Sequence, residues 1–274
     1  MLNIKGQPIT WEEMKFLFIF CPNNCGTTAM SQYVEKQLSA ERKVFLPPMP
    51  CEGQQLRGVK GKMMGGKHWA TTKVIDFVEV RKIWETYANQ RLFIEASPPN
   101  IVRPDMIAEV FGDDSAAITS ICNPYQQVAS SMRRYRWKPA KAAVKWVKRA
   151  KMLRHILKTR PHLPFVSYEQ FTFDPTSVNR ALGIPVIESA DIEGKRGSDI
   201  KGVRSGYARA IGFLSRSDVI TISRRLEKAR GLTSFFGYDI RGPGILAEVS
   251  SINPEEFNIG RNRRALRDAG VPPP

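Results

Sequence analysis

Residues 15–30 have the sequence K-F-L-F-I-F-C-P-N-N-C-G-T-T-A-M, and they are more informative about the fold than any other part of the chain. Residues 15–21 form a continuous apolar run rich in aromatic side chains, which is typical of a strand buried on both faces of a parallel sheet. Residues 21–26 predict a turn, and residues 28–38 predict a helix. Backbone N–H groups at the start of a helix that follows a strand and a Gly-containing turn can bind an anion. The stretch therefore predicts an α/β protein with an anion site beside its first strand.

The alternation of strands and helices continues along the chain. Apolar runs predict strands over residues 44–46, 91–95, 116–122 and 164–168. Apolar spacing and start signals, including a capping box at Ser215 and Asp218, predict helices over residues 68–89, 104–111, 124–135, 139–158 and 216–229. We therefore expect a three-layer α/β/α domain with a mainly parallel central sheet over residues 14–240. Residues 1–13 would be a leader, and residues 241–274, rich in Gly and Pro at their ends, an extended tail.

Composition sets the class of protein. Of the 274 residues, 42% are hydrophobic and 25% charged, as in an ordinary globular protein, which excludes a wholly disordered chain. The longest apolar run, residues 16–21, is far shorter than the roughly 20 residues of a membrane-spanning helix. No basic region precedes that run, and the four cysteines lack the spacing of a disulfide framework. We expect a cytoplasmic protein without a membrane span.

The charge is strongly positive and unevenly distributed. Lys and Arg number 42 against 26 Asp and Glu, a net charge of +16. No acidic residue occurs between Ser115 and Tyr168, and twelve basic residues lie within residues 133–160. Such a field attracts polyanions, although a charge run can also be a merely solvated helix face. The charge leaves nucleic acid open as a partner, but nothing else in the sequence favours it.

The loop at residues 21–30 differs from the P-loop of nucleotide kinases. That motif is G-x-x-x-x-G-K-[ST], with its lysine directly after the second glycine. Here Thr27 follows Gly26, and the first glycine is missing. An ATP- or GTP-dependent kinase is therefore the least favoured of three functional hypotheses.

The loop instead resembles the 5′-phosphosulfate loop of the sulfotransferases, a basic residue and a small residue followed by G-T-T. Four later segments resemble motifs of that family in the same order, and the resemblance spans residues 14–240. They are E-A-S-P-P-N-I-V-R at residues 95–103, C-N-P-Y-Q-Q-V-A-S at 122–130, Y-E-Q-F-T-F-D-P at 168–175 and F-G-Y at 236–238. The resemblance implies a P-loop NTPase-like sulfotransferase fold and the donor 3′-phosphoadenosine-5′-phosphosulfate (PAPS). It implies transfer of a sulfonate to a hydroxyl or amine of a small-molecule or glycan acceptor, including anionic ones.

The resemblance also implies donor-binding residues. The 5′ end would lie on Asn24, Cys25, Gly26, Thr27 and Thr28, and the 3′-phosphate near Cys122 and Ser130. Three positions lack the family's basic residue, because Asn24, Ala96 and Cys122 replace it. Candidate substitutes are Arg57, Lys60, Lys62, Lys67, Arg133 and Arg204. Alternatively the donor differs, or the domain binds a nucleotide or polyanion without turnover, which is the second hypothesis.

Transfer requires a base for the acceptor proton. The histidine of small-molecule members is absent, since residues 95–97 are E-A-S. Other members use a glutamate after the second strand, and Glu52 lies at that place. We rank Glu52 first, Glu95 second and His68 third, and count Asn24 with the catalytic positions because it replaces the loop's cation.

Each of these residues also has a plain structural interpretation. Glu52 could be a solvated loop carboxylate, Ser130 simple helix surface, and Thr27 and Thr28 ordinary helix caps. Cys21 and Cys25 are four residues apart but lack the second pair that a zinc site needs, so no metal is expected.

Overall fold

The computed structural model describes residues 1–39, 41–64, 69–186 and 210–250. The chain forms two compact units, one of residues 1–121 and 152–197, the other of residues 122–151 and 198–274. No helix in the described ranges is long and apolar enough to cross a membrane.

The first unit is built on a parallel sheet of four strands. They are β1 (Phe16–Phe20), β2 (Val44–Phe45), β3 (Leu92–Glu95) and β4 (Ser115–Thr119), in the order β2-β3-β1-β4. β1 lies in the middle, with Phe16 opposite Phe93 of β3 and Ser115 of β4. All five β1 residues are buried, as expected where helices cover both faces of a parallel sheet. The expected parallel sheet is confirmed.

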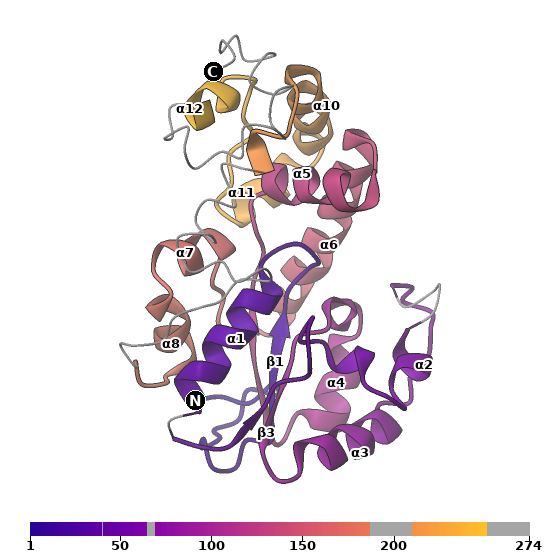
Figure 1. Ribbon diagram of the computed structural model, residues 1–274, viewed down its shortest axis with the longest axis vertical. Coiled ribbons are helices and arrows are strands. Elements are labelled where there is room, and N and C mark those ends of the chain that lie inside the picture. Colours follow the sequence, from indigo (N-terminus) through magenta and orange to yellow (C-terminus); the bar gives the residue numbers. More distant parts are fainter. Residues whose placement is uncertain (40, 65–68, 187–209, 251–274) are drawn as a thin grey trace. The chain divides into compact units, whose positions relative to one another are not determined.

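Helices cover both faces of this sheet. Figure 1 shows α1 (Thr27–Leu38) on one side of the strands, with α3 (Phe77–Ala88) and α4 (Pro104–Phe111) on the other. Alternate β1 residues point to one face of the sheet, so Phe16 and Phe18 both pack against Trp84 of α3 and Phe111 of α4. On the other face, Tyr33 of α1 packs edge-on against Phe171 of α7 (Tyr168–Phe173). Next to it, α8 spans Thr176–Leu182.

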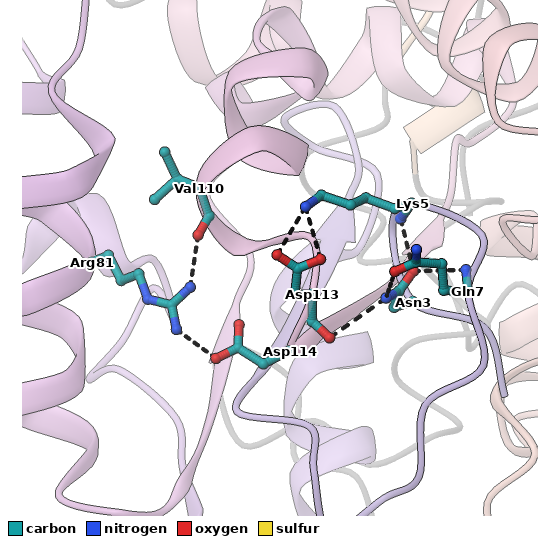
Figure 2. Close-up of polar contacts among 7 residues, drawn as sticks. All are labelled: Asn3, Lys5, Gln7, Arg81, Val110, Asp113 and Asp114. Carbon is teal, nitrogen blue, oxygen red and sulfur yellow. Dashed lines mark hydrogen bonds and ion pairs between the residues drawn. The ribbon is translucent and has the colours of Figure 1, made fainter.

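The first residues of the chain are part of this unit. Figure 2 shows Lys5 bonded through Nζ to both carboxylate oxygens of Asp113, at 2.8 Å each. The Asn3 side chain accepts hydrogen bonds from the N–H groups of Lys5 and Gln7. In the same view Arg81 of α3 holds Asp114, so the turn between α4 and β4 is bound from two sides. Part of the expected leader therefore packs on the sheet domain.

The second unit is helical. It contains α5 (Pro124–Tyr135), the part of α6 (Pro139–Thr159) up to residue 151, α10 (Arg216–Glu227), α11 (Arg230–Phe235) and α12 (Ile245–Ser250). Trp146 of α6 is fully buried and donates its indole N–H to the Cys122 carbonyl oxygen at 3.1 Å. Tyr125 joins α5 to α10, since its hydroxyl lies 2.8 Å from that of Ser223.

Three expectations about the elements are corrected. Residues 164–168 form only an isolated bridge, between Phe165 and Thr119, because a capping box at Ser167 begins α7 there. The helix expected over residues 68–89 begins at Phe77, capped by Asp76. In the expected tail, Ile245–Ser250 forms α12, and Ile245 and Leu246 are buried.

Candidate functional site

The loop after β1 requires a left-handed turn. Asn24 and Gly26 have φ angles of 62° and 77°, a conformation that asparagine tolerates and glycine adopts freely. A Cβ at Gly26 would lie 1.8 Å from Cε2 of Tyr168, so a larger residue would collide with this ring as well. Tyr168 belongs to the Y-E motif at residues 168–169, but the sequence did not predict that its ring lies against Gly26.

Gly26 is also the N-cap of α1, and no side chain caps this helix end. Thr27 and Thr28 are the first helical residues and are half-buried, so the interpretation of either threonine as the cap is wrong. The first turn contains no acidic residue. Its N–H groups have no partner within the helix and lie at the positive end of the helix dipole. The arrangement suits an anion.

The segment that carries Glu52 is tied to the same helix end. The Thr28 hydroxyl donates a hydrogen bond to the Pro50 carbonyl oxygen at 3.2 Å, two residues before Glu52. Glu52 is half-buried, and its Oε2 accepts hydrogen bonds from the side-chain amides of Gln54 at 2.6 Å and Gln55 at 3.4 Å. Glu52 therefore lies on a loop that is hydrogen-bonded to the start of α1, and the two glutamine amides bind one of its carboxylate oxygens.

Glu95, at the end of β3, has different surroundings. It is fully buried, and both of its oxygens accept hydrogen bonds. Oε2 accepts from the backbone N–H of Gly53 at 2.7 Å, and Oε1 from the Ser97 N–H and the Asn100 side-chain amide at 2.9 Å each. Gly53 begins the 3₁₀ turn η1 (Gly53–Gln55), and Asn100 lies in η2 (Pro98–Val102). Glu95 thus connects the loop of Glu52 to the end of β3.

The environment shifts the protonation of Glu95. Burial raises the pKa of its carboxyl group to about 7, although the hydrogen bonds from Ser97, Gly53 and Asn100 oppose the shift. A Cβ at Gly53 would lie 2.2 Å from Oε2 of Glu95 and 2.9 Å from Nε1 of Trp84, so a larger residue here would displace the Glu95 carboxylate. The motif at residues 95–103 contained Asn100, but its bond to Glu95 and the role of Gly53 follow only from the structure.

Two positions at which the resemblance predicts a cation are closed to solvent. Ala96 and Cys122 have no exposed surface, so neither side chain faces solvent. Cys122, Ser130 and Arg133 all lie in the second unit. On α5, Ser130 is half-buried and Arg133 is exposed. Their predicted contact with a 3′-phosphate stays a prediction.

The candidate substitute cations differ in their surroundings. Arg57 and Lys60 are exposed, whereas Lys62 of α2 (Lys60–Met63) forms a salt bridge of 2.6 Å with Glu79. Two further candidate cations, Lys67 and Arg204, lie outside the described residues, and so does His68, the third candidate base.

The cysteines are free, buried thiols. Burial raises the pKa of the Cys21 thiol well above its usual value, and its Sγ contacts the Cys25 carbonyl oxygen at 3.5 Å. Within the part of the chain that the structure describes, no group of three or more His, Cys, Asp or Glu side chains could hold a metal ion.

Comparisons with known proteins support the fold. No family model and no curated protein matches the chain. Among solved structures, the sulfotransferase domain from the Synechococcus PCC 7002 olefin synthase matches with a TM-score of 0.53 and 18% identity, covering 82% of this chain and 95% of that domain. The sulfotransferase domain from the curacin biosynthetic pathway has a TM-score of 0.49 and 14% identity, covering 83% and 99%. The first of these matches shows that the chain has a sulfotransferase-like fold, as its motifs predict.

Proposed function

We propose that this protein is a sulfotransferase that moves a sulfonate group from PAPS to a hydroxyl or amine of an acceptor. One observation carries the proposal: the uncapped start of α1 is bonded through Thr28 to the loop that bears Glu52. An anion-binding helix end and a carboxylate on adjoining segments are what the two halves of this reaction need.

In the proposed reaction the acceptor oxygen or nitrogen attacks the sulfur atom of the donor. A new bond to sulfur forms while the bond from sulfur to the phosphate oxygen breaks, and adenosine 3′,5′-bisphosphate leaves. Negative charge develops on the departing phosphate oxygen. The N–H groups around Gly26, Thr27 and Thr28 would stabilise it, because donors already oriented in a folded site need no reorganisation.

Glu52 would take the proton from the acceptor. Its side chain is half-buried and keeps Oε1 free of the two glutamine amides. Glu95 is less suited to this role, since it has no exposed surface and N–H donors engage both of its oxygens. This difference favours Glu52 as base.

The acceptor would bind over the loop at residues 49–67, and we propose a small molecule or glycan, including anionic ones. We also propose a cytoplasmic location, since four free thiols suit a reducing compartment.

A second function is binding without turnover. The observation that favours it is the loss of three cations, with Ala96 and Cys122 both inaccessible to solvent. Charge-assisted hydrogen bonds to phosphate are the strong ones, and their loss would weaken catalysis.

The deciding experiment separates binding from transfer. The protein is retained on immobilised adenosine 3′,5′-bisphosphate, then incubated with labelled PAPS and mixed acceptors. Retention with transfer supports the sulfotransferase, and retention without transfer the binding protein. Elution by ATP but not by adenosine 3′,5′-bisphosphate would contradict both and favour a kinase.

Site variants test the position of the donor. Thr27→Ala and Thr28→Ala should each weaken adenosine 3′,5′-bisphosphate binding by up to about 1.5–3 kcal/mol, the contribution of one hydrogen bond to a charged group. Thr28→Ser keeps the hydroxyl that bonds Pro50 and should restore affinity. The control, Thr86→Ala, removes an exposed helix hydroxyl of α3. Unchanged affinity in both alanine variants would rule out this placement.

A further inference from the structure

A cationic surface covers the end of α5, the α5–α6 connection and the first half of α6. We call it the α5–α6 surface; it comprises the half-buried rings of Tyr135 and Trp137 and seven exposed basic residues, Arg134, Arg136, Lys138, Lys141, Lys145, Lys148 and Lys151. None of the seven forms a salt bridge with a residue that the structure describes. All of them belong to the second unit.

The charges of this surface oppose the stability of α6. Lys141, Lys145, Lys148 and Lys151 follow one another at intervals of four, three and three residues, so they share one face over about 15 Å and repel each other. The first turn of α6 contains no acidic residue, so the positive end of the helix dipole adds to the field. A bound polyanion would remove this repulsion.

Aromatic rings lie among the cations. The ring centroids of Tyr135 and Trp137 are 4.9 Å apart, with an angle of 32° between the ring planes. The Arg134 guanidinium lies 5.5 Å from the centre of the Tyr135 ring, and the Lys141 ammonium 5.4 Å from that of Trp137. Both cations are on long, exposed side chains that can turn away within nanoseconds and open the ring faces.

We propose that the α5–α6 surface binds single-stranded nucleic acid. Lysines along a helix face would contact the phosphates, and bases would stack on Tyr135 and Trp137, which is how sequence-tolerant single-strand binding works in general. This binding is independent of sulfonate transfer.

The residues of the surface favour single-stranded nucleic acid over a lipid surface and over a sulfated polymer. Insertion into a lipid surface needs several exposed apolar side chains. Among residues 134–151, which carry this surface, only Val144 is large, apolar and exposed, at 51%. A sulfated polymer would contact the cations but has no base to stack on the rings. The aromatic pair therefore favours nucleic acid.

The test measures the anisotropy of a fluorescein-labelled oligothymidylate of about 12 nucleotides, a length within known single-strand site sizes. Lys141→Gln/Lys145→Gln/Lys148→Gln should reduce the slope of log affinity against log salt concentration by about 2. The control, Lys36→Gln/Lys43→Gln/Lys82→Gln, removes three exposed charges from the first unit and should leave the slope unchanged. The first variant should also unfold at the same temperature as the natural protein or higher, since it relieves repulsion.

Variants of Trp137 test whether bases stack on the aromatic rings or whether the phosphates alone account for binding. Trp137→Ala should weaken oligothymidylate binding about fivefold or more, whereas Trp137→Phe, which keeps a ring, should not. An abasic oligomer of equal length should bind more weakly and should not respond to Trp137→Ala. The proposal is overturned if Trp137→Ala binds oligothymidylate normally, if the abasic oligomer or heparin binds as tightly as oligothymidylate, or if vesicles of anionic phospholipid displace the oligonucleotide at matched charge.

Discussion

Glu95 directs both carboxylate oxygens to N–H donors and has no exposed surface. Such a group is expensive to ionise but well suited to hold backbone segments together, since each oxygen can accept more than one hydrogen bond. Because Glu95 accepts a hydrogen bond from Gly53 of η1, a change in the protonation of Glu95 alters a bond that holds the loop carrying Glu52.

The raised pKa of Glu95 predicts a stability that depends on pH. Because the folded-state value is about 7 and the unfolded value 4.5, the folded protein binds more protons between these pH values. This residue's contribution to stability is complete below pH 4.5 and is lost as the pH rises through about 7, by about 3 kcal/mol. The difference in unfolding free energy between the natural protein and Glu95→Gln should therefore shrink by about 2–3 kcal/mol between about pH 5 and pH 8.

Urea unfolding at the two pH values measures this difference. Glu109→Gln on α4, where the side chain is exposed, is the matched control for replacing a glutamate by glutamine. A difference for Glu95→Gln that stays constant with pH would contradict the assigned environment.

Glu52→Gln is the corresponding prediction for the proposed base. The substitution keeps the shape of the side chain but removes its basicity, so transfer should fall by about 10²–10⁴ while adenosine 3′,5′-bisphosphate still binds. Single-turnover transfer and equilibrium binding, measured on the same preparation, separate the two effects. If Glu95→Gln loses transfer and Glu52→Gln does not, Glu95 is the base.

At the scale of elements, the turn between β1 and α1 depends on a close approach to α7. Gly26→Ala places a Cβ within 1.8 Å of the Tyr168 ring and imposes a positive φ on alanine. Gly183, the C-cap of α8, has a φ of +65° but nothing within 4 Å of a Cβ. Gly183→Ala should therefore cost about 1–2 kcal/mol from the backbone alone, and Gly26→Ala clearly more.

Thermal unfolding of the two variants separates the clash with Tyr168, which only Gly26→Ala makes, from the backbone strain that both variants share. Gly26→Ala should also lose adenosine 3′,5′-bisphosphate binding, because the helix end moves, whereas Gly183→Ala should retain it. Equal costs in the two variants would mean that Tyr168 does not constrain the loop.

For the whole molecule, the prediction concerns the donor product and metal ions. At a hundredfold excess over its dissociation constant, adenosine 3′,5′-bisphosphate should stabilise the protein by about 2.7 kcal/mol. The sequence predicts no metal site, so we expect EDTA to leave this stabilisation unchanged. A loss of the thermal shift in EDTA, restored by a divalent cation, would contradict a metal-independent site.

Local signals in the sequence determined the elements. Apolar runs predicted β1 and β3, Pro104 predicted the start of α4, and the capping box at Ser215 predicted that of α10, because each signal acts within a few residues. The order of motifs also predicted the sulfotransferase-like fold, which the match to the olefin synthase domain confirms.

Contacts between distant residues were decided only by the tertiary structure. The approach of Tyr168 to Gly26 crosses more than a hundred residues, and Glu95 meets Gly53 across 42. Residues 164–168 have the composition of a strand, yet they make a single bridge because the capping box of α7 competes for the same segment. Burial raises the pKa of Glu95 and leaves Cys122 without exposed surface. It results from packing on all sides of a residue, so no local sequence pattern encodes it.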